Sequence, residues 1–176
     1  MNKYFLIQFA IGAGTTVAAL MSYKKYADWD GSNLTNPIKK YEPTIAATLL
    51  WALLFYIFLF HQSVSGFMQK AALTAKAKKD GTKPPSMASI KYGSGGGLTI
   101  LRANRTVANT MEQSFPFLVG LWLHAVMLNP LKAAQLGWAW IAVRAFYPLV
   151  FGRGPILFSV TVINYVCIAA LFWPLF

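Results

Sequence analysis

The sequence places one acidic side chain, Glu112, inside a long apolar stretch. A charge in such surroundings is costly unless a partner satisfies it, so Glu112 marks a candidate site. In a helix, with about 100° between successive residues, Arg102, Arg105 and Asn109 fall with Glu112 inside an arc of roughly 80°, which also contains Pro116. This face combines guanidinium donors with a carboxylate acceptor, the groups that bind a charged small molecule.

A second apolar stretch contains a single cation, Arg144. Trp140, Tyr147 and Phe151 stand four, three and seven residues from it, which are the spacings of neighbours on one helix face. The chain is therefore expected to carry two polar faces on two consecutive helices.

Two interpretations of these faces remain open. Glu112 could form an interhelical salt-bridge network with Arg105 or Arg144, with no ligand involved. Alternatively, the two faces could form a site for a charged small molecule, either within the chain or against another subunit.

The composition indicates what holds these helices in place. Of 176 residues, 56% are hydrophobic and 12% charged, and the mean hydropathy is +0.47. This composition excludes an ordinary soluble enzyme and indicates an integral membrane protein. The net charge of +11 is explained by basic loops beside the membrane, so we expect no nucleic-acid partner. With Cys167 as the lone cysteine and two histidines, we expect no metal site.

Five apolar runs approach the length of about 20 residues that crosses a bilayer, which predicts an all-α membrane protein. They are Tyr4 to Tyr23, Ile45 to Val64, Asn109 to Leu128, Ala133 to Phe151, and Ile156 to Phe176. The short turns at 129–132 and 152–155 make the last three runs antiparallel. The stretches 24–42 and 66–102 are expected to be loops, with 93–97 as a flexible linker, and the six lysines between residues 66 and 102 place that loop on the cytoplasmic side.

The stretch from Arg105 to Pro116 resembles the MAPEG family (membrane-associated proteins in eicosanoid and glutathione metabolism). Its second helix reads Arg, three residues, Asn, two residues, Glu, and a proline four residues on, as in Arg105, Asn109, Glu112 and Pro116. The resemblance covers residues 43–176 and implies a four-helix bundle that forms a trimer. Residues 1–42 would then add an extra N-terminal transmembrane helix and a loop.

The resemblance also implies a ligand, glutathione, bound between subunits. Arg105 and Arg144 would hold its carboxylates, Asn109 would donate and accept hydrogen bonds, and Glu112 would suit its ammonium. Tyr147 would form part of the wall. The implied activity is that of a transferase or peroxidase acting on lipophilic electrophiles or lipid hydroperoxides, in the endoplasmic reticulum or another organelle membrane.

One departure from the family pattern concerns catalysis. Active relatives carry an arginine near the start of the last helix, where this chain has Leu157. Arg153 is the nearest substitute, although a loop arginine also reaches readily to water and headgroups. A second hypothesis is therefore a non-catalytic structural subunit, or a lipid-binding component, of a larger membrane complex. It predicts a heterologous interface on Gly12, Gly14 and Ala18.

Overall fold

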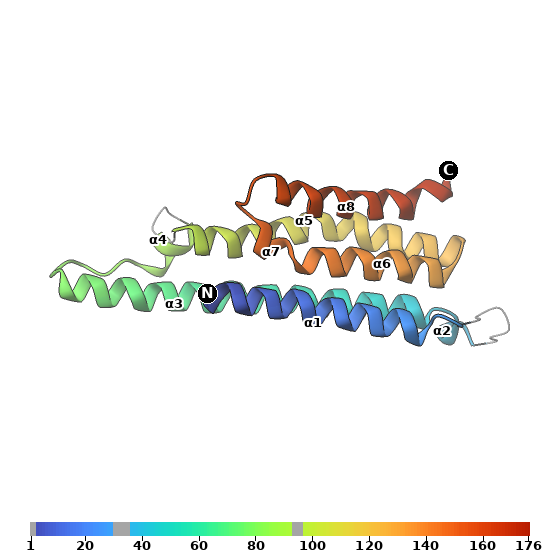
Figure 1. The fold of residues 1–176 in the computed structure, drawn as a ribbon, viewed down its shortest axis with the longest axis horizontal. Helices are drawn as coiled ribbons and strands as arrows, with labels where there is room; N and C mark the ends of the chain where they lie inside the picture. The colour runs from blue at the N-terminus through green and yellow to red at the C-terminus, as the bar shows by residue number, and fades with distance from the viewer. Residues whose placement is uncertain (1–2, 30–35, 93–96) are drawn as a thin grey trace. The chain divides into compact units, whose positions relative to one another are not determined.

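The computed structural model describes residues 3–29, 36–92 and 97–176, and within these ranges the chain is helical and has no strand (Figure 1). The elements are α1 (Lys3–Lys25), α2 (Pro37–Lys40), α3 (Glu42–Lys79), α4 (Met87–Tyr92), α5 (Gly97–Met127), α6 (Pro130–Ala145), α7 (Tyr147–Val150), α8 (Pro155–Phe172) and the 3-10 turn η2 (Trp173–Leu175). The predicted all-α fold is confirmed.

In the described ranges, three helices are long and apolar enough to cross a membrane, namely Phe5–Lys25, Glu42–Lys79 and Pro155–Leu175. The other two predicted spans differ from these. In α5, the polar residues Glu112, Gln113 and His124 interrupt the apolar run. Helix α6 has 16 residues, fewer than a perpendicular span of the hydrocarbon requires.

The prediction of one helix from Ala133 to Phe151 is wrong, because α6 ends at Ala145 and α7 begins at Tyr147. The physical reason is Pro148 at the second position of α7. Proline has no N–H to donate to the carbonyl four residues earlier, and its ring clashes with that carbonyl. The following turn agrees with expectation, since Gly152 and Gly154 both adopt positive φ angles, of 77° and 58°.

The prediction of a loop at 66–102 is wrong in large part, and that of a loop at 24–42 is wrong at residues 24–25, 37–40 and 42. Helix α3 continues to Lys79, and α4 and the first turns of α5 occupy much of the remainder. Residues 70–79 are rich in alanine and lysine, both strong helix formers, so they extend the apolar helix without a break. In the other stretch, α1 reaches Lys25 and α2 covers 37–40, while residues 30–35 and the linker residues 93–96 lie outside the described ranges.

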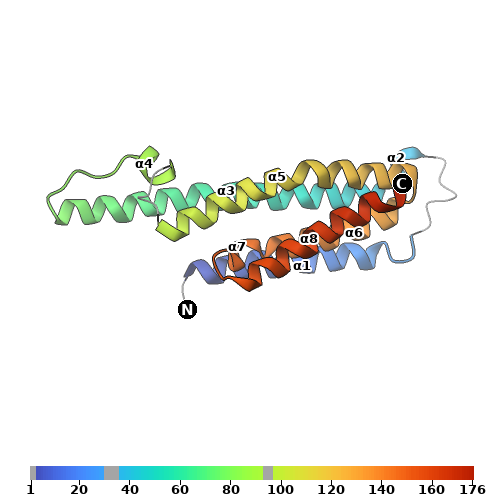
Figure 2. The same ribbon diagram turned by 90° about the horizontal axis from the view of Figure 1, so that it is seen from above.

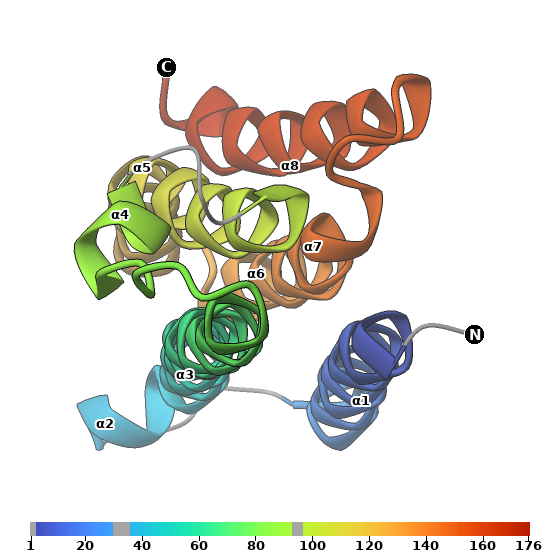
Figure 3. The same cartoon turned by 90° about the vertical axis from the view of Figure 1, so that its left-hand side faces the viewer.

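The chain divides into two compact units. Residues 1–54 and 110–176 form unit 1, and residues 55–109 form unit 2. In unit 1, α6 packs against α1 and α8, and α7 also contacts both of these helices. Figures 1 and 3 show α6 and α7 between α8 and α1. In unit 2, the end of α3, α4 and the start of α5 enclose a small core that includes Ala77, Ile90, Ile100 and Ala103.

Helix α1 is an integral part of unit 1. Its buried positions are Gln8, Gly12, Thr15, Ala19 and Tyr26, which follow the alternating four- and three-residue spacing of a helix packed nearly parallel to another. Figure 2 shows α1 running alongside α6. At the far end of this contact the Tyr26 ring stacks on Trp138 with 5.8 Å between ring centroids.

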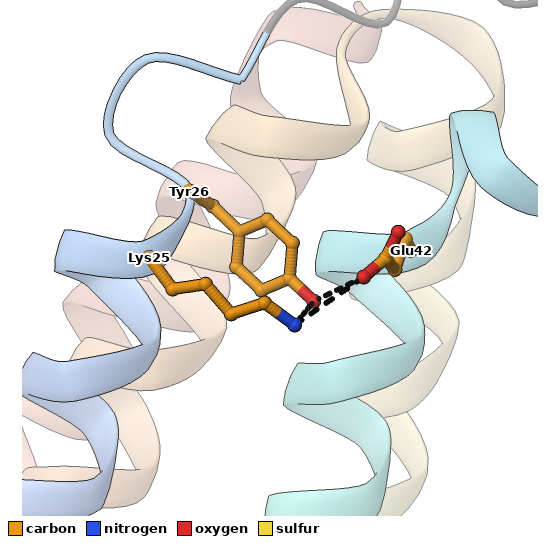
Figure 4. A network of polar contacts seen from close by, with 3 residues as sticks. All are labelled: Lys25, Tyr26 and Glu42. Atoms are coloured by element: carbon orange, nitrogen blue, oxygen red, sulfur yellow. Dashed lines mark hydrogen bonds and ion pairs between the residues drawn. The ribbon is translucent and has the colours of Figure 1, made fainter.

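A three-residue cluster joins the end of α1 to the start of α3 (Figure 4). Tyr26 Oη donates a 2.8 Å hydrogen bond to Glu42 Oε1, and Lys25 Nζ lies 3.0 Å from Tyr26 Oη and 3.4 Å from Glu42 Oε1. The ion pair is exposed, so water and salt screen it and it adds little to the stability of the fold. The buried Tyr26 is therefore the main link, because its ring packs on Trp138 while its hydroxyl reaches Glu42.

The packing of α1 gives a testable prediction at Gly12. A Cβ atom at this position would lie 2.8 Å from the Phe146 ring, so the Gly12→Leu variant should lose about 1–3 kcal/mol of folding free energy through overpacking. The matched control is Gly14→Leu, because a Cβ at Gly14 meets nothing within 4 Å. Thermal unfolding of both variants in detergent provides the measurement. Equal melting temperatures for the two variants would contradict the packing of α1 described here.

Candidate functional site

Helix α5 presents two different polar faces. The sequence-predicted face carries Arg105, Asn109 and Glu112, of which Arg105 and Glu112 are exposed and Asn109 is half-buried. A second face carries Thr106, Thr110 and Gln113, all of which are buried. The two faces lie side by side on the helix surface because each pair of corresponding residues differs by one position.

Arg144 lies against the buried face of α5. Its Nε donates a 2.9 Å hydrogen bond to Thr110 Oγ1, and its Nη1 lies 3.4 Å from Gln113 Oε1. The side chain is 0% exposed. Its position in the last turn of α6 also places the cation where the helix dipole is negative. Arg144 thus links α6 to α5 by hydrogen bonds in the interior of unit 1.

Two aromatic rings complete the environment of this guanidinium. The Arg144 Cζ atom lies 4.4 Å from the centroid of the Tyr147 ring and 5.9 Å from that of Trp140. Trp140 in turn stacks on Phe117 with centroids 4.2 Å apart. Tyr147 is buried and lies beside Arg144, three residues earlier, even though α6 ends at Ala145 and α7 begins at Tyr147.

Glu112 has a different environment. Within the described residues, its carboxylate forms no hydrogen bond or ion pair, although it attracts the Arg144 guanidinium at longer range. Its neighbours on the outer surface, Met111 and Phe115, are 66% and 77% exposed. Among the described residues, Glu112 therefore does not form the predicted interhelical salt bridge with Arg105 or Arg144.

Pro116 changes the backbone hydrogen bonding of α5 at the same point. It lies inside α5 without ending the helix. Because proline has no N–H, it cannot donate the usual helical hydrogen bond to the backbone carbonyl of Glu112, four residues earlier. The backbone of α5 therefore lacks one of its usual hydrogen bonds at Glu112.

The residues Thr110 and Gln113 were not among the sequence-predicted site residues. They share the helical spacing of the buried Ala103, Phe117 and Leu121, and this periodicity is the signal that identifies them as inward-facing. A threonine and a glutamine on the inner face of an apolar helix require a buried partner, which Arg144 provides.

Active relatives carry an arginine near the start of the last helix, and the corresponding region of this chain is the start of α8 and the turn before it. Leu157 is half-buried and lies on the same face of α8 as the buried Asn164 and Leu171, which follow at seven-residue steps. Arg153, the candidate substitute, is exposed, and its Cζ atom lies 5.4 Å from the centroid of the Phe5 ring in α1. The guanidinium of Arg153 is thus directed to the N-terminal helix.

Some buried polar atoms in unit 1 have no hydrogen-bond partner in the described part of the chain. They include both side-chain polar atoms of Asn164 and the indole Nε1 of Trp140. Such groups usually bind ordered water, since leaving one unsatisfied costs about 1–3 kcal/mol. His124, by contrast, is satisfied, with its Nδ1 3.0 Å from the carbonyl oxygen of Leu171.

Comparison with known proteins identifies the family. The MAPEG family model matches residues 44–176, which include α5, α6, α7 and α8 and most of α3. Searches of curated proteins and of solved structures returned no significant match. The family match covers well over half of the chain and includes the Arg105, Asn109, Glu112 and Pro116 pattern. The protein therefore belongs to the MAPEG family and is an integral membrane protein of this glutathione-related group.

Proposed function

We propose that the protein binds glutathione on the outer face of α5, at an interface between subunits of a homotrimer. Glu112 engages the ammonium group, Arg105 a carboxylate, and Asn109 the peptide groups of the ligand. Residues 43–176 form the family domain in this proposal, and residues 1–42 are an addition to it. A lipophilic second substrate, an electrophile or a lipid hydroperoxide, enters from the bilayer.

The observation that carries this proposal is the position of Glu112. It is exposed among large apolar side chains, and it has no bonded partner in the described part of the chain. A carboxylate left facing lipid would be costly, whereas a carboxylate facing a cationic group of a ligand in a subunit interface is satisfied.

Arg144 and Tyr147 support the site from within. Because Arg144 is fully buried in the single chain, a ligand on the outer face of α5 does not reach its guanidinium directly. We assign it a positioning role, in which its bonds to Thr110 and Gln113 set the rotation of α5 and hence the direction of Glu112. The ring of Tyr147 holds the guanidinium in this place.

The expected chemistry is a transferase or peroxidase reaction in which activation of the thiol is weak. Leu157 cannot stabilise a thiolate, and Arg153 contacts Phe5 instead of turning toward α5. This same feature favours a second candidate function, a non-catalytic family member that is a structural subunit or lipid-binding component of a larger complex. Under that alternative, glutathione is either unbound or bound without turnover.

A substitution at Glu112 tests the proposed site. The Glu112→Gln variant keeps the size of the side chain and removes its charge, so glutathione affinity should fall by about tenfold or more, as expected for loss of a charge-assisted hydrogen bond. Isothermal titration calorimetry with the purified protein gives the affinity. Asp80→Asn is the matched control, because it makes the same change at an exposed residue in the turn after α3. Unchanged affinity in Glu112→Gln would remove Glu112 from the site, and absence of binding in the unmodified protein would favour the alternative function.

A further inference from the structure

A pocket of about 160 Å³ lies within unit 2 and is unrelated to the outer face of α5. It is enclosed by three helices that the chain brings together from separate regions. Its lining includes Gln62, Ser63 and Gly66 of α3, Lys91 of α4, and Ile100 and Asn104 of α5. Apolar walls and a few polar groups therefore surround one small volume, which is the usual make-up of a ligand site.

A chain of hydrogen bonds holds the polar side of this pocket. Gln62 Nε2 donates to Asn104 Oδ1 at 3.0 Å, and Asn104 Nδ2 donates to the backbone carbonyl of Lys91, also at 3.0 Å. These bonds fix the amide groups in the pocket wall and tie α3, α5 and α4 to one another. Among the described residues, the second N–H of the Gln62 amide and the N–H groups of the Lys91 ammonium have no hydrogen-bond acceptor.

The charge of unit 2 selects the sign of the ligand. Residues 55–109 contain eight lysines and arginines and one acid, Asp80, so this segment carries +7 of the formal +11 of the chain. The ammonium of Lys91 lies beside the Tyr92 ring, 5.5 Å from its centroid. A pocket that presents hydrogen-bond donors in a positively charged segment attracts an anion.

The position of the pocket along α3 selects the kind of anion. The apolar run of α3 ends at Val64 and the first lysine after it is Lys70, so Gln62, Ser63 and Gly66 lie at the depth of the lipid headgroups. Just beyond them, Phe67 and Met68 are 67% and 52% exposed, and Phe67 also lines the pocket. Exposed apolar side chains beside lysines are typical of a surface that contacts the membrane interface.

We propose that this pocket binds the phosphate headgroup of an anionic phospholipid. The Lys91 ammonium and the Gln62 amide bind the phosphate, and Phe67 contacts the first methylene groups of the acyl chains. The site involves none of the residues assigned to glutathione, so it stands or fails independently of that proposal.

The first test fills the pocket without disturbing the fold. A Cβ at Gly66 meets nothing within 4 Å, so a Gly66→Leu side chain can enter the open space, and leucine is also the better helix former. Native mass spectrometry of the full chain in detergent, titrated with phosphatidylglycerol and with phosphatidylcholine, measures the binding. We expect tighter binding of phosphatidylglycerol by the unmodified protein and at least a tenfold loss of that binding in Gly66→Leu. Gly14→Leu, the same change in α1, should bind like the unmodified chain.

The second test separates a defined site from diffuse attraction to a basic surface. Lys91→Gln should weaken phosphatidylglycerol binding about fivefold, the effect of one basic residue near an anionic headgroup. Lys83→Gln removes the same charge from an exposed lysine that does not line the pocket and should have little effect. Equal losses in the two lysine variants, or equal affinity for the two lipids, would overturn the proposal. The proposal would also be overturned if glycerol phosphate alone bound as tightly as the lipid and displaced it. The ligand would then be a soluble anion.

Discussion

A Leu157→Arg variant should conjugate glutathione to a generic electrophile at least ten times faster than the unmodified chain. Leu157 is half-buried near the start of α8, where active relatives carry an arginine, so the side chain at this position is not wholly exposed to lipid. A guanidinium within hydrogen-bonding distance of the thiol lowers the pKa of the bound glutathione, and each pKa unit requires about 1.4 kcal/mol of preferential thiolate stabilisation. The measurements are the thiolate absorbance of bound glutathione and the rate of turnover.

The control for this gain of activity is Phe158→Arg. Phe158 is 73% exposed, so this variant adds the same charge one residue along α8 but on its outer side. It should leave thiolate formation unchanged. Strong thiolate absorbance and fast turnover in the unmodified protein would show that another group, such as Arg153, already activates the thiol. Binding without activation in both the unmodified chain and Leu157→Arg would instead favour the non-catalytic function.

Replacement of Arg144 by alanine should destabilise the protein by about 3 kcal/mol or more. The change leaves a cavity between Trp140 and Tyr147, and it removes the donors to Thr110 Oγ1 and Gln113 Oε1 in a fully buried environment. Thermal unfolding in detergent measures the effect. A change below 1 kcal/mol would contradict the structural role assigned to this side chain.

A double-mutant cycle makes the same test specific to one bond. Thr110→Val keeps the shape of the side chain and removes the oxygen that accepts from Arg144. If the two groups interact as the structure shows, the double variant Arg144→Ala with Thr110→Val should cost less than the two single variants together. Additive costs would mean that the hydrogen bond contributes little and that packing alone explains the effect of Arg144.

The sequence was sufficient to predict the helical class and the polar face of α5. A 100° rotation per residue determines which side chains of a continuous helix share a face, so Arg105, Asn109 and Glu112 follow from spacing alone. The partners of Arg144 could not be predicted from spacing, because several residues on α5 can accept hydrogen bonds from a guanidinium. The choice of Thr110 and Gln113 depends on how α5 is rotated about its own axis, and packing against other helices sets that rotation.

Two other elements show different limits of sequence-based prediction. Pro148 indicates a helix break before α7. The residues around it form one apolar run, however, and this run led to the prediction of a single membrane span. The extension of α3 to Lys79 was missed because hydropathy falls after Val64. Hydropathy reports where a helix can lie in lipid, whereas alanine and lysine propensities determine where the helix itself ends.

The packing of α1 has a consequence for the order in which the protein can assemble. Helix α1 is synthesised before α6 and α7, the helices that it contacts. Until α6 is made, Gln8 and Thr15 have no α6 to pack against, and the contacts described between the end of α1 and the start of α3 are those of Lys25 and Tyr26 with Glu42. Docking of α1 therefore depends on contacts that are remote in sequence, which slows this step, and nascent forms should depend on membrane chaperones for longer than those of a chain without α1.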